Sequence, residues 1–451
     1  MGKELHIVHC IDTEGPMYES IEETFKRIES IFSIKIKPCK ENLKKLQEKQ
    51  IDLDGNEDKV CNLVSKKRIT LNSNWEEIGE MLNNIQSKEF RNKLVDSVGK
   101  GWRYNWFCLD HVNMNGENPR KRDLGHHKVY DFYSKKSLEK NNQEDFISWH
   151  YHPLPYTQNY HNSGVAYLNS SNIWEILSKK IIERNWFPST YRPGFHTIRP
   201  DSNWFLEQWI PFDYSNQSTQ NEGDQPDLIL GRWGDWRRAN KSWTPYHPDI
   251  DDYQKEGNCR RWIFRCLNME ARLRELSQLD VDKAFEQANN DETTVLSFTN
   301  HDFRKMSHEI NKIRDFIVKS QEKYPDVKIY FSSAIEAARS ALNLKPKLID
   351  LNLEIIENEK DILRIRVTSN SNIFGPQPYL AIKTINNDFI WENFDRGLDD
   401  FEWYFTFDYM HIPNNVVDKI GIAANSNDGT TEVINLDLNT LIKKKYIYNH
   451  E

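Results

Sequence analysis

The sequence predicts an α/β fold with parallel strands, followed by an antiparallel β-sandwich. Apolar runs of strand length alternate with helical patterns from residue 5 to about residue 340, which is typical of βα units. Lys345-Pro346-Lys347 then has the character of a linker. Beyond it, short alternating segments are separated by turn-forming clusters, as expected for a sandwich of about 100 residues. We therefore predict two domains, residues 1–344 and 345–451.

The first strand is expected at Leu5–Ile11, an apolar run bounded by Gly15-Pro16 that places Asp12 and Glu14 at its carboxyl end. The charged segment 35–72 is weakly periodic and is expected to be an insertion with short elements of its own. The other strands of this domain are expected at 105–109, 145–149, 189–196, 211–215, 261–267, 293–299 and 327–331. Helices are expected at 19–31, 74–85 (capped by Asn74), 88–98, 171–185, 281–288, 304–322 and 333–342. Strands of the second domain are expected at 349–355, 362–368, 379–385, 403–407, 419–423 and 432–438.

Ionisable residues follow most of the predicted parallel strands. Because the carboxyl ends of parallel strands meet at one edge of the sheet, function gathers there. Six such endings in one chain are hard to explain as independent surface decoration, so they predict an active site. They are Asp12/Glu14, Asp110/His111, His150/His152, Arg192/His196, Asp213 and His301/Asp302.

Two of these endings have the spacing of metal ligands. Residues at i and i+2 of a strand share a face, so Asp12 and Glu14 can divide their work between proton transfer and metal binding. The alternative is an acidic turn or helix start. His150 and His152 suit chelation of one ion, and the alternative is a pair of structural histidines. Weaker ligand candidates are His111, His161 and the pair His126-His127.

Two further endings suit acid–base chemistry and charge pairing. His301, after a very apolar strand, suits a general acid, whereas the alternative for His301-Asp302 is a cap on the following helix. Arg192 precedes the rigid Pro193-Gly194 turn and could hold a carboxylate through two hydrogen bonds. The alternative for Arg192 is a surface salt bridge.

Composition and missing motifs exclude several classes of protein. The 14 Trp, 19 Tyr and 22 Phe rule out a disordered chain, and the net charge of −8 argues against a nucleic-acid partner. There is no apolar run of 18 residues and no signal-peptide pattern, so we expect neither a transmembrane segment nor export. The six cysteines form no CxxC pair, which favours reduced thiols in the cytoplasm. Neither a Walker loop nor a Gly-x-Ser-x-Gly elbow occurs.

Taken in order, residues 5 to about 340 resemble the polysaccharide deacetylase family (carbohydrate esterase family 4, the chitooligosaccharide deacetylase homology domain), as a divergent member. The family's fold is a distorted (β/α)7 barrel that binds a divalent ion, commonly zinc. Its first motif resembles Asp12-Thr13-Glu14, which implies Asp12 as the base and Glu14 as a metal ligand. Its His-x-x-x-His-Pro motif matches His152-Pro153, but Ser148 stands at the first histidine, so His150 or His111 must substitute.

The later motifs assign the remaining roles by resemblance. Arg192-Pro193-Gly194-Phe195 resembles the third motif, in which the arginine orients the base. Asp213, in Phe212-Asp213-Tyr214, would tune the catalytic histidine. His301 would then protonate the leaving amine.

The resemblance implies a metal-dependent hydrolase that removes an acetyl-like group from an amino sugar of a cell-envelope glycan, such as O-antigen or capsule, or of its cytoplasmic precursor. The alternatives are a degenerate barrel that binds glycan without hydrolysis, and hydrolysis of another C–N or glycosidic bond. Whether the chain forms a homodimer is left open. Tryptophans that could stack on sugar rings, or else fill the core, are Trp204, Trp209, Trp233, Trp236, Trp243 and Trp262.

Overall fold

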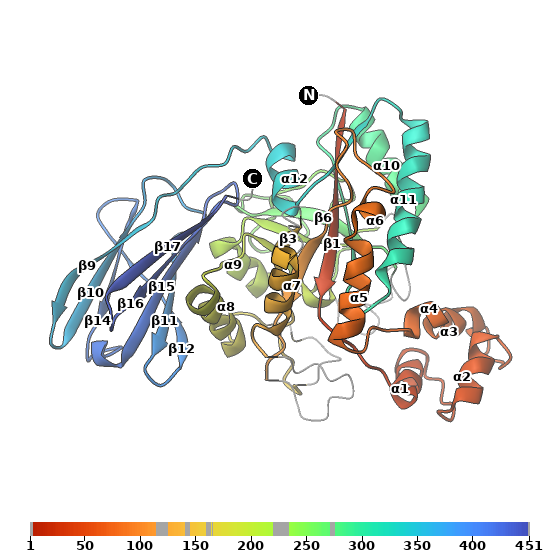
Figure 1. The fold of residues 1–451 in the computed structure, drawn as a ribbon, viewed down its shortest axis with the longest axis horizontal. Helices are drawn as coiled ribbons and strands as arrows, with labels where there is room; N and C mark the ends of the chain where they lie inside the picture. The colour runs from red at the N-terminus through yellow and green to blue at the C-terminus, as the bar shows by residue number, and fades with distance from the viewer. Residues whose placement is uncertain are drawn as a thin grey trace.

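A closed barrel of seven parallel strands carries two antiparallel sheets at its flank, formed by the C-terminal part of the chain (Figure 1). This computed structural model describes residues 3–113, 125–139, 145–158, 164, 166–219, 234–270 and 276–449. The predicted fold class is therefore confirmed: parallel βα units come first, and antiparallel strands follow.

The barrel strands follow one another around the barrel in chain order. They are β1 (Glu4–Thr13), β2 (Asn105–Leu109), β3 (Phe146–Tyr151), β4 (Thr190–Pro193), β5 (Phe212–Asn216), β6 (Trp262–Asn268) and β7 (Val295–His301). Strand β1 closes the ring, because it pairs along its length with β7 and, over Cys10–Thr13, with β2. An eighth strand, β8 (Lys328–Phe331), pairs with the first half of β1, over Glu4–Ile7.

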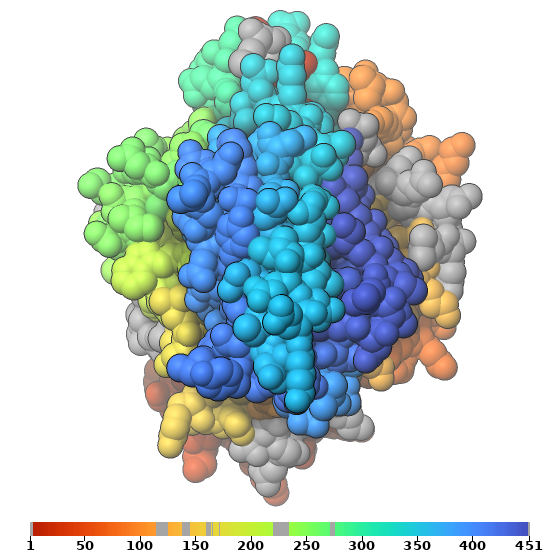
Figure 2. All heavy atoms as spheres, turned by 90° about the vertical axis from the view of Figure 1, so that its left-hand side faces the viewer, coloured from red at the N-terminus to blue at the C-terminus, as the bar shows by residue number. Residues whose placement is uncertain are grey.

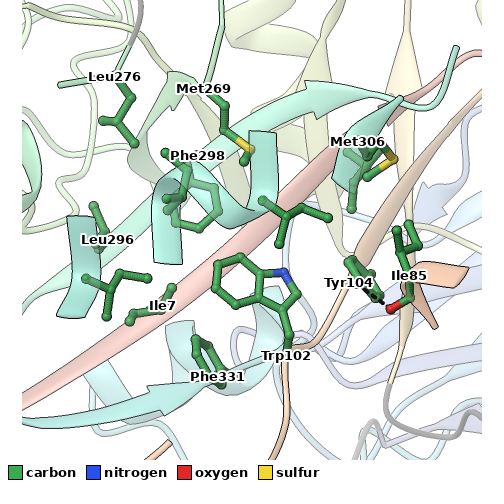
Figure 3. Close-up of a cluster of buried hydrophobic side chains, with 14 of the residues drawn as sticks. Ile7, Ile85, Trp102, Tyr104, Met269, Leu276, Leu296, Phe298, Met306 and Phe331 are labelled. Carbon is green, nitrogen blue, oxygen red and sulfur yellow. Dashed lines mark hydrogen bonds between the residues drawn. The ribbon is translucent and has the colours of Figure 1, made fainter. Parts of the chain in front are cut away.

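Nearly every barrel residue is buried because both faces of the ring are covered. Alternate residues of β1 point inward, so Val8 and Cys10 pack with Phe107, Phe264 and Cys266 inside the ring. The intervening residues point outward beneath the helices. Figure 3 shows this outer layer, with Trp102 lying among Ile7, Phe298 and Phe331.

Helices surround the barrel and form the insertion. Asn74 caps α5 as predicted, accepting a 2.9 Å hydrogen bond from the backbone of Glu77. The helices are α1 (Ile21–Phe32), α2 (Lys40–Gln47), α3 (Glu57–Leu63), α4 (Lys66–Ile69), α5 (Trp75–Ile85), α6 (Lys88–Arg91), α7 (Lys128–Glu139), α8 (Ser171–Arg184), α9 (Pro200–Trp209), α10 (Gln278–Asn289), α11 (Met306–Lys323) and α12 (Ala334–Ala341).

The helix predicted over 88–98 is wrong beyond Arg91. The carboxylate of Asp96 accepts hydrogen bonds from the backbone of Val98 and Lys100, at 3.0 and 2.8 Å, which offers this stretch an alternative to helical bonding. Gly99 then turns the chain with a φ of +82°. The insertion predicted over 35–72 does contain short elements, because α2, α3 and α4 lie within it. Together with α1 they enclose an apolar cluster of their own that includes Phe25, Ile28 and Val60.

The C-terminal strands form two antiparallel sheets. Their order is β13-β14-β10-β9 in one sheet and β12-β11-β15-β16-β17 in the other. Residues such as Ile365 and Trp403 from the first sheet pack with Ile382 and Ile420 from the second, so the sheets form a sandwich. Figure 2 looks onto this sandwich with the chain around β9 and β10 at the front. The strands are β9 (Asn352–Glu359), β10 (Ile362–Thr368), β11 (Tyr379–Thr384), β12 (Phe389–Glu392), β13 (Asp395–Arg396), β14 (Glu402–Phe407), β15 (Val417–Asn425), β16 (Thr431–Asp437) and β17 (Ile442–Tyr448).

The five-stranded sheet packs its other face against α8 of the barrel (Figure 1). Trp391 stacks on Trp174 with ring centroids 4.2 Å apart and an interplanar angle of 14°. The Tyr379 hydroxyl donates a 3.1 Å hydrogen bond to the backbone oxygen of Trp174, and the Asn435 amide donates a 2.8 Å bond to that of Ile181. The sandwich therefore covers the helix that joins β3 to β4.

Over the described part of the chain, every helix is too short or too polar to cross a membrane.

Candidate metal centre

Asp12 and Arg192 form a buried ion pair inside the barrel, near the carboxyl ends of its strands. Asp12 lies two residues beyond Cys10 on β1, so its side chain also points into the ring. Arg192, which β4 directs inward, reaches across the ring to both carboxylate oxygens. Its Nε lies 2.6 Å from Oδ1 and its Nη2 3.1 Å from Oδ2. This two-point contact fixes the orientation of the Asp12 carboxylate.

Glu14, His150 and His152 converge beside this pair, and one ligand atom from each lies within 4.8 Å of the other two. The Nε2 of His152 is 3.6 Å from Oε1 of Glu14, and the Nε2 of His150 is 4.0 Å from it. Glu14 and His150 are buried, whereas His152 is half-buried. Two imidazoles and one carboxylate around a common point are a ligand set that suits zinc.

The hydrogen bonds of His150 prepare it for metal binding. Its Nδ1 lies 2.9 Å from the backbone oxygen of Arg192, which can only accept, so Nδ1 carries the proton. Nε2 therefore keeps its lone pair and faces Nε2 of His152 at 2.9 Å. A backbone carbonyl that fixes the tautomer in this way is a common partner of metal-binding histidines.

His301 completes the group from β7. Its Nε2 is 3.8 Å from Oε1 of Glu14 and 4.0 Å from Oδ2 of Asp12, and its side chain is 25% exposed. The register explains this proximity, because Asp12 and His301 are direct neighbours on β1 and β7. The imidazole therefore stands at the open side of the group, where a bound molecule can reach it.

Charge controls the ionisation of this cluster. Burial would raise the pKa of Asp12, but Arg192, followed by His150 and His301, outweighs that effect and holds this pKa well below its usual range. Burial lowers the pKa of His150 to about 4, although Asp12 opposes the shift. At neutral pH, Asp12 is thus a carboxylate, and His150 is a neutral imidazole that can donate its lone pair.

Asp302 holds the chain beyond β1 in place. Its carboxylate accepts hydrogen bonds from the backbone of Glu14 and Gly15, at 2.8 and 2.9 Å, and from the hydroxyl of Tyr133 at 2.9 Å. The alternative prediction, that Asp302 caps the next helix, is wrong, because α11 begins at Met306 with Lys305 at its cap position. Asp302 instead positions the backbone that carries Glu14.

Gly194 makes room for His152. A Cβ atom at Gly194 would lie 2.3 Å from Cγ of His152, so no larger residue fits without displacing the imidazole. Phe195 covers the other side of that ring with an edge-on contact between centroids 5.1 Å apart. The Pro-Gly-Phe sequence after Arg192 therefore builds the wall behind one ligand.

Two of the residues predicted for the site lie outside the group. His111 is buried, and its Nε2 lies 2.9 Å from the backbone oxygen of Glu14. Asp213 pairs with Arg261, with 3.2 Å between Oδ2 and Nε. It lies in register with Tyr191, whose ring packs against Trp149, whereas its neighbour Tyr214 stacks on Phe264 inside the ring. Asp213 thus faces the helix layer, away from His301.

The weaker ligand candidates form other contacts. His126 and His127 pair with Glu175 and Glu183 of α8, at 3.1 and 2.6 Å. His161 and Trp233 lie outside the described residues. Of the other tryptophans named for sugar stacking, Trp209, Trp236 and Trp243 are buried in the core, Trp262 is half-buried and Trp204 is 41% exposed.

Sequence reasoning assigned no role to His196, which the structure places against Arg192. Nδ1 of His196 is 3.5 Å from Nη2 of Arg192, and its Nε2 is 3.3 Å from Nδ2 of Asn268. The signal was present, because His196 is one of the ionisable residues that follow a predicted strand. Asn268, the last residue of β6, is polar without being ionisable and gave no such signal.

Comparison of the chain with protein-family models, with curated proteins and with solved structures found no match.

Proposed function

We propose that this protein is a metal-dependent hydrolase that removes an acyl group from an amino sugar. The observation that carries the proposal is the convergence of Glu14, His150 and His152 beside the Asp12–Arg192 pair at the carboxyl end of a (β/α)7-like barrel. The order of the strand-end motifs along the chain, which resembles that of polysaccharide deacetylases, supports the choice of an acylated amino sugar.

The residues divide into binding and proton-transfer roles. Glu14, His150 and His152 would hold a divalent ion, for which zinc suits the donor set best. Such an ion supplies Lewis acidity, which polarises a carbonyl group and makes water more acidic. Asp12, kept ionised and oriented by Arg192, would take the proton of the attacking water.

His301 suits the second proton transfer. Its imidazole is more exposed than those of His150 and His152, and it lies within 4.0 Å of the carboxylates of Asp12 and Glu14. From there it can donate a proton to the departing amine while the carboxylates stabilise its charged form. Asp213 takes no part in this proposal, because its carboxylate pairs with Arg261.

The test begins with the metal. We expect the purified protein, cleared of metal by a chelator, to bind one Zn²⁺ in isothermal titration calorimetry. His152→Ala should lose this binding, whereas His126→Ala, a histidine paired with Glu175 away from the group, should keep it. Equal Zn²⁺ binding by both variants would contradict the proposed metal centre.

Activity is then measured as acetate release from N-acetylated amino-sugar oligomers and from nucleotide-linked N-acetyl sugars. Asp12→Asn should keep Zn²⁺ and lose turnover, whereas Asp400→Asn, at an exposed position, should keep both. Binding of these sugars by the wild type without any acetate release would favour the rival function, a barrel that binds glycan without hydrolysis.

A further inference from the structure

We propose that His196 is a substrate-binding residue, whose imidazole N–H donates a hydrogen bond to an oxygen of the acylated sugar next to Asp12. This inference rests on the proposed function and adds a residue to its site. It comes from two observations. Both ring nitrogens of His196 face hydrogen-bond donors, and the backbone of His196 has the left-handed conformation.

The first observation concerns the partners of the imidazole. Gln217 donates from Nε2 to the backbone oxygen of Cys266 at 2.8 Å, which fixes the orientation of its amide. Its Oε1 therefore accepts from Nδ2 of Asn268 at 3.3 Å, so the Asn268 group next to His196 is an NH₂ and not an oxygen. The other neighbour, Nη2 of Arg192, is also a donor.

A neutral imidazole has one N–H and one lone pair. The lone pair of His196 can accept from Asn268 or from Arg192, and in either case its N–H points at another donor. Among the described residues, no hydrogen bond supplies an acceptor for that N–H. Burial and the charge of Arg192 hold the pKa of His196 well below its ordinary value, so the ring is neutral. An oxygen of a bound molecule would satisfy the N–H.

The second observation concerns the turn that carries His196. Phe195 and His196 have φ values of +51° and +52°, a left-handed conformation that few residues other than glycine adopt. The turn persists because its carbonyl groups are held from behind. The indole of Trp236 donates to the oxygen of His196 at 2.9 Å, and the backbone of Gly234 donates to the oxygen of Phe195 at 3.2 Å. Strained residues held in this way are concentrated at functional sites.

The location of His196 suits contact with a substrate. The ring is half-buried, and it touches the arginine that orients Asp12. Phe195 meanwhile lies on the ring of His152. One short turn therefore connects the proton acceptor, a metal ligand and the free imidazole N–H.

The experiment replaces His196 with glycine, which accepts the left-handed backbone without strain. We expect His196→Gly to keep the wild-type melting temperature or exceed it, and to bind Zn²⁺ as the wild type does. Its kcat/KM for acetate release should fall by roughly 10²-fold, the size of loss seen when one preorganised donor is removed from a site. Added imidazole should restore part of the lost rate, because the substitution leaves space for it.

Lys49→Gly is the matched control. Lys49 is exposed and has a φ of +55°, so this change relieves the same kind of backbone strain. It does so in the insertion and not at the site. It should leave kcat/KM unchanged. The proposal is overturned if His196→Gly retains wild-type kcat/KM, or if its loss of rate follows a loss of Zn²⁺ binding. Failure of the proposed function is a separate result, because the wild type itself would then release no acetate.

Discussion

Arg192 holds both oxygens of Asp12 across the interior of the barrel, and neither side chain has access to solvent beyond a few per cent. Its Nη1 also donates to the backbone oxygen of Tyr214 on β5. One guanidinium thus connects three strands, β1, β4 and β5. The pair orients a carboxylate for proton transfer and also holds the polar end of the barrel together.

Removing Arg192 should destabilise the protein strongly. Arg192→Met leaves the Asp12 carboxylate buried without its partner, and breaking a buried pair in this way costs about 3–5 kcal/mol. Urea denaturation measures the free energy of unfolding. Arg364→Met, which removes an exposed arginine paired with Glu357, should cost no more than about 1 kcal/mol. Similar losses in both variants would contradict this account of the buried pair.

A methyl group at Gly194 should weaken metal binding. Because its Cβ would lie 2.3 Å from the His152 ring, Gly194→Ala must shift that imidazole from its place beside Glu14. We expect Zn²⁺ affinity to fall by about 10- to 100-fold, as for other changes that disturb the support of a ligand. Calorimetric titration measures the affinity. Gly79→Ala, where nothing lies within 4 Å of the added atom, is the control and should bind Zn²⁺ like the wild type.

Stability should fall in acid partly through His9. The indole of Trp102 donates to Nδ1 of His9 at 2.9 Å, so Nε2 carries the proton and donates to Asn300 at 3.0 Å. Burial lowers the pKa of His9 to about 3, whereas its ordinary value is 6.5. Between these two values the unfolded chain binds a proton that the folded chain does not, so the contribution of His9 falls by about 1.4 kcal/mol for each unit of decreasing pH.

The measurement compares wild type and His9→Gln by urea denaturation from pH 8 to pH 4. The variant lacks the imidazole. Below pH 6.5 its free energy of unfolding should therefore fall less steeply than that of the wild type, by about 1.4 kcal/mol per pH unit. The decline will not vanish, because burial also lowers the pKa of His150, which acts in the same direction. Parallel curves for the two proteins would show that His9 is not responsible.

The sandwich should be needed for a stable barrel. We proposed a boundary between residues 344 and 345, but the five-stranded sheet covers α8, and Trp391 stacks on Trp174 of that helix. Expressed alone, residues 1–344 should aggregate, because the apolar side of α8 would meet water. In the full chain, Trp391→Ala should cost about 2–4 kcal/mol, and Ile356→Ala, on an exposed position of β9, should cost less than about 1 kcal/mol. Soluble, folded 1–344 would refute this role.

Local pattern predicted most elements, and the wrong or missing predictions have different physical causes. Strand β1 and the cap of α5 follow from apolar run length and from Asn74. The helix expected over 88–98 ended early because Asp96 bonds to nearby backbone groups. Strand β17 carries three consecutive lysines and is mostly exposed, so it lacks the alternation that marks a half-buried strand. This strand forms because its backbone pairs with β16, a contact that the sequence pattern does not reveal.

The length of each apolar run was enough to show which side chains follow the parallel strands, because the run marks where a buried strand stops. Because the strands are parallel, Asp12, His150 and Arg192 were expected at the same edge of the sheet. Which of these side chains meet depends on how the ring closes. Closure of the ring brings Arg192 to Asp12 and Glu14 to the two histidines, whereas Asp213, on the outward face of β5, pairs with Arg261. The reason is that an apolar run involves only neighbours in the chain, while contacts across a barrel depend on how all seven strands pair.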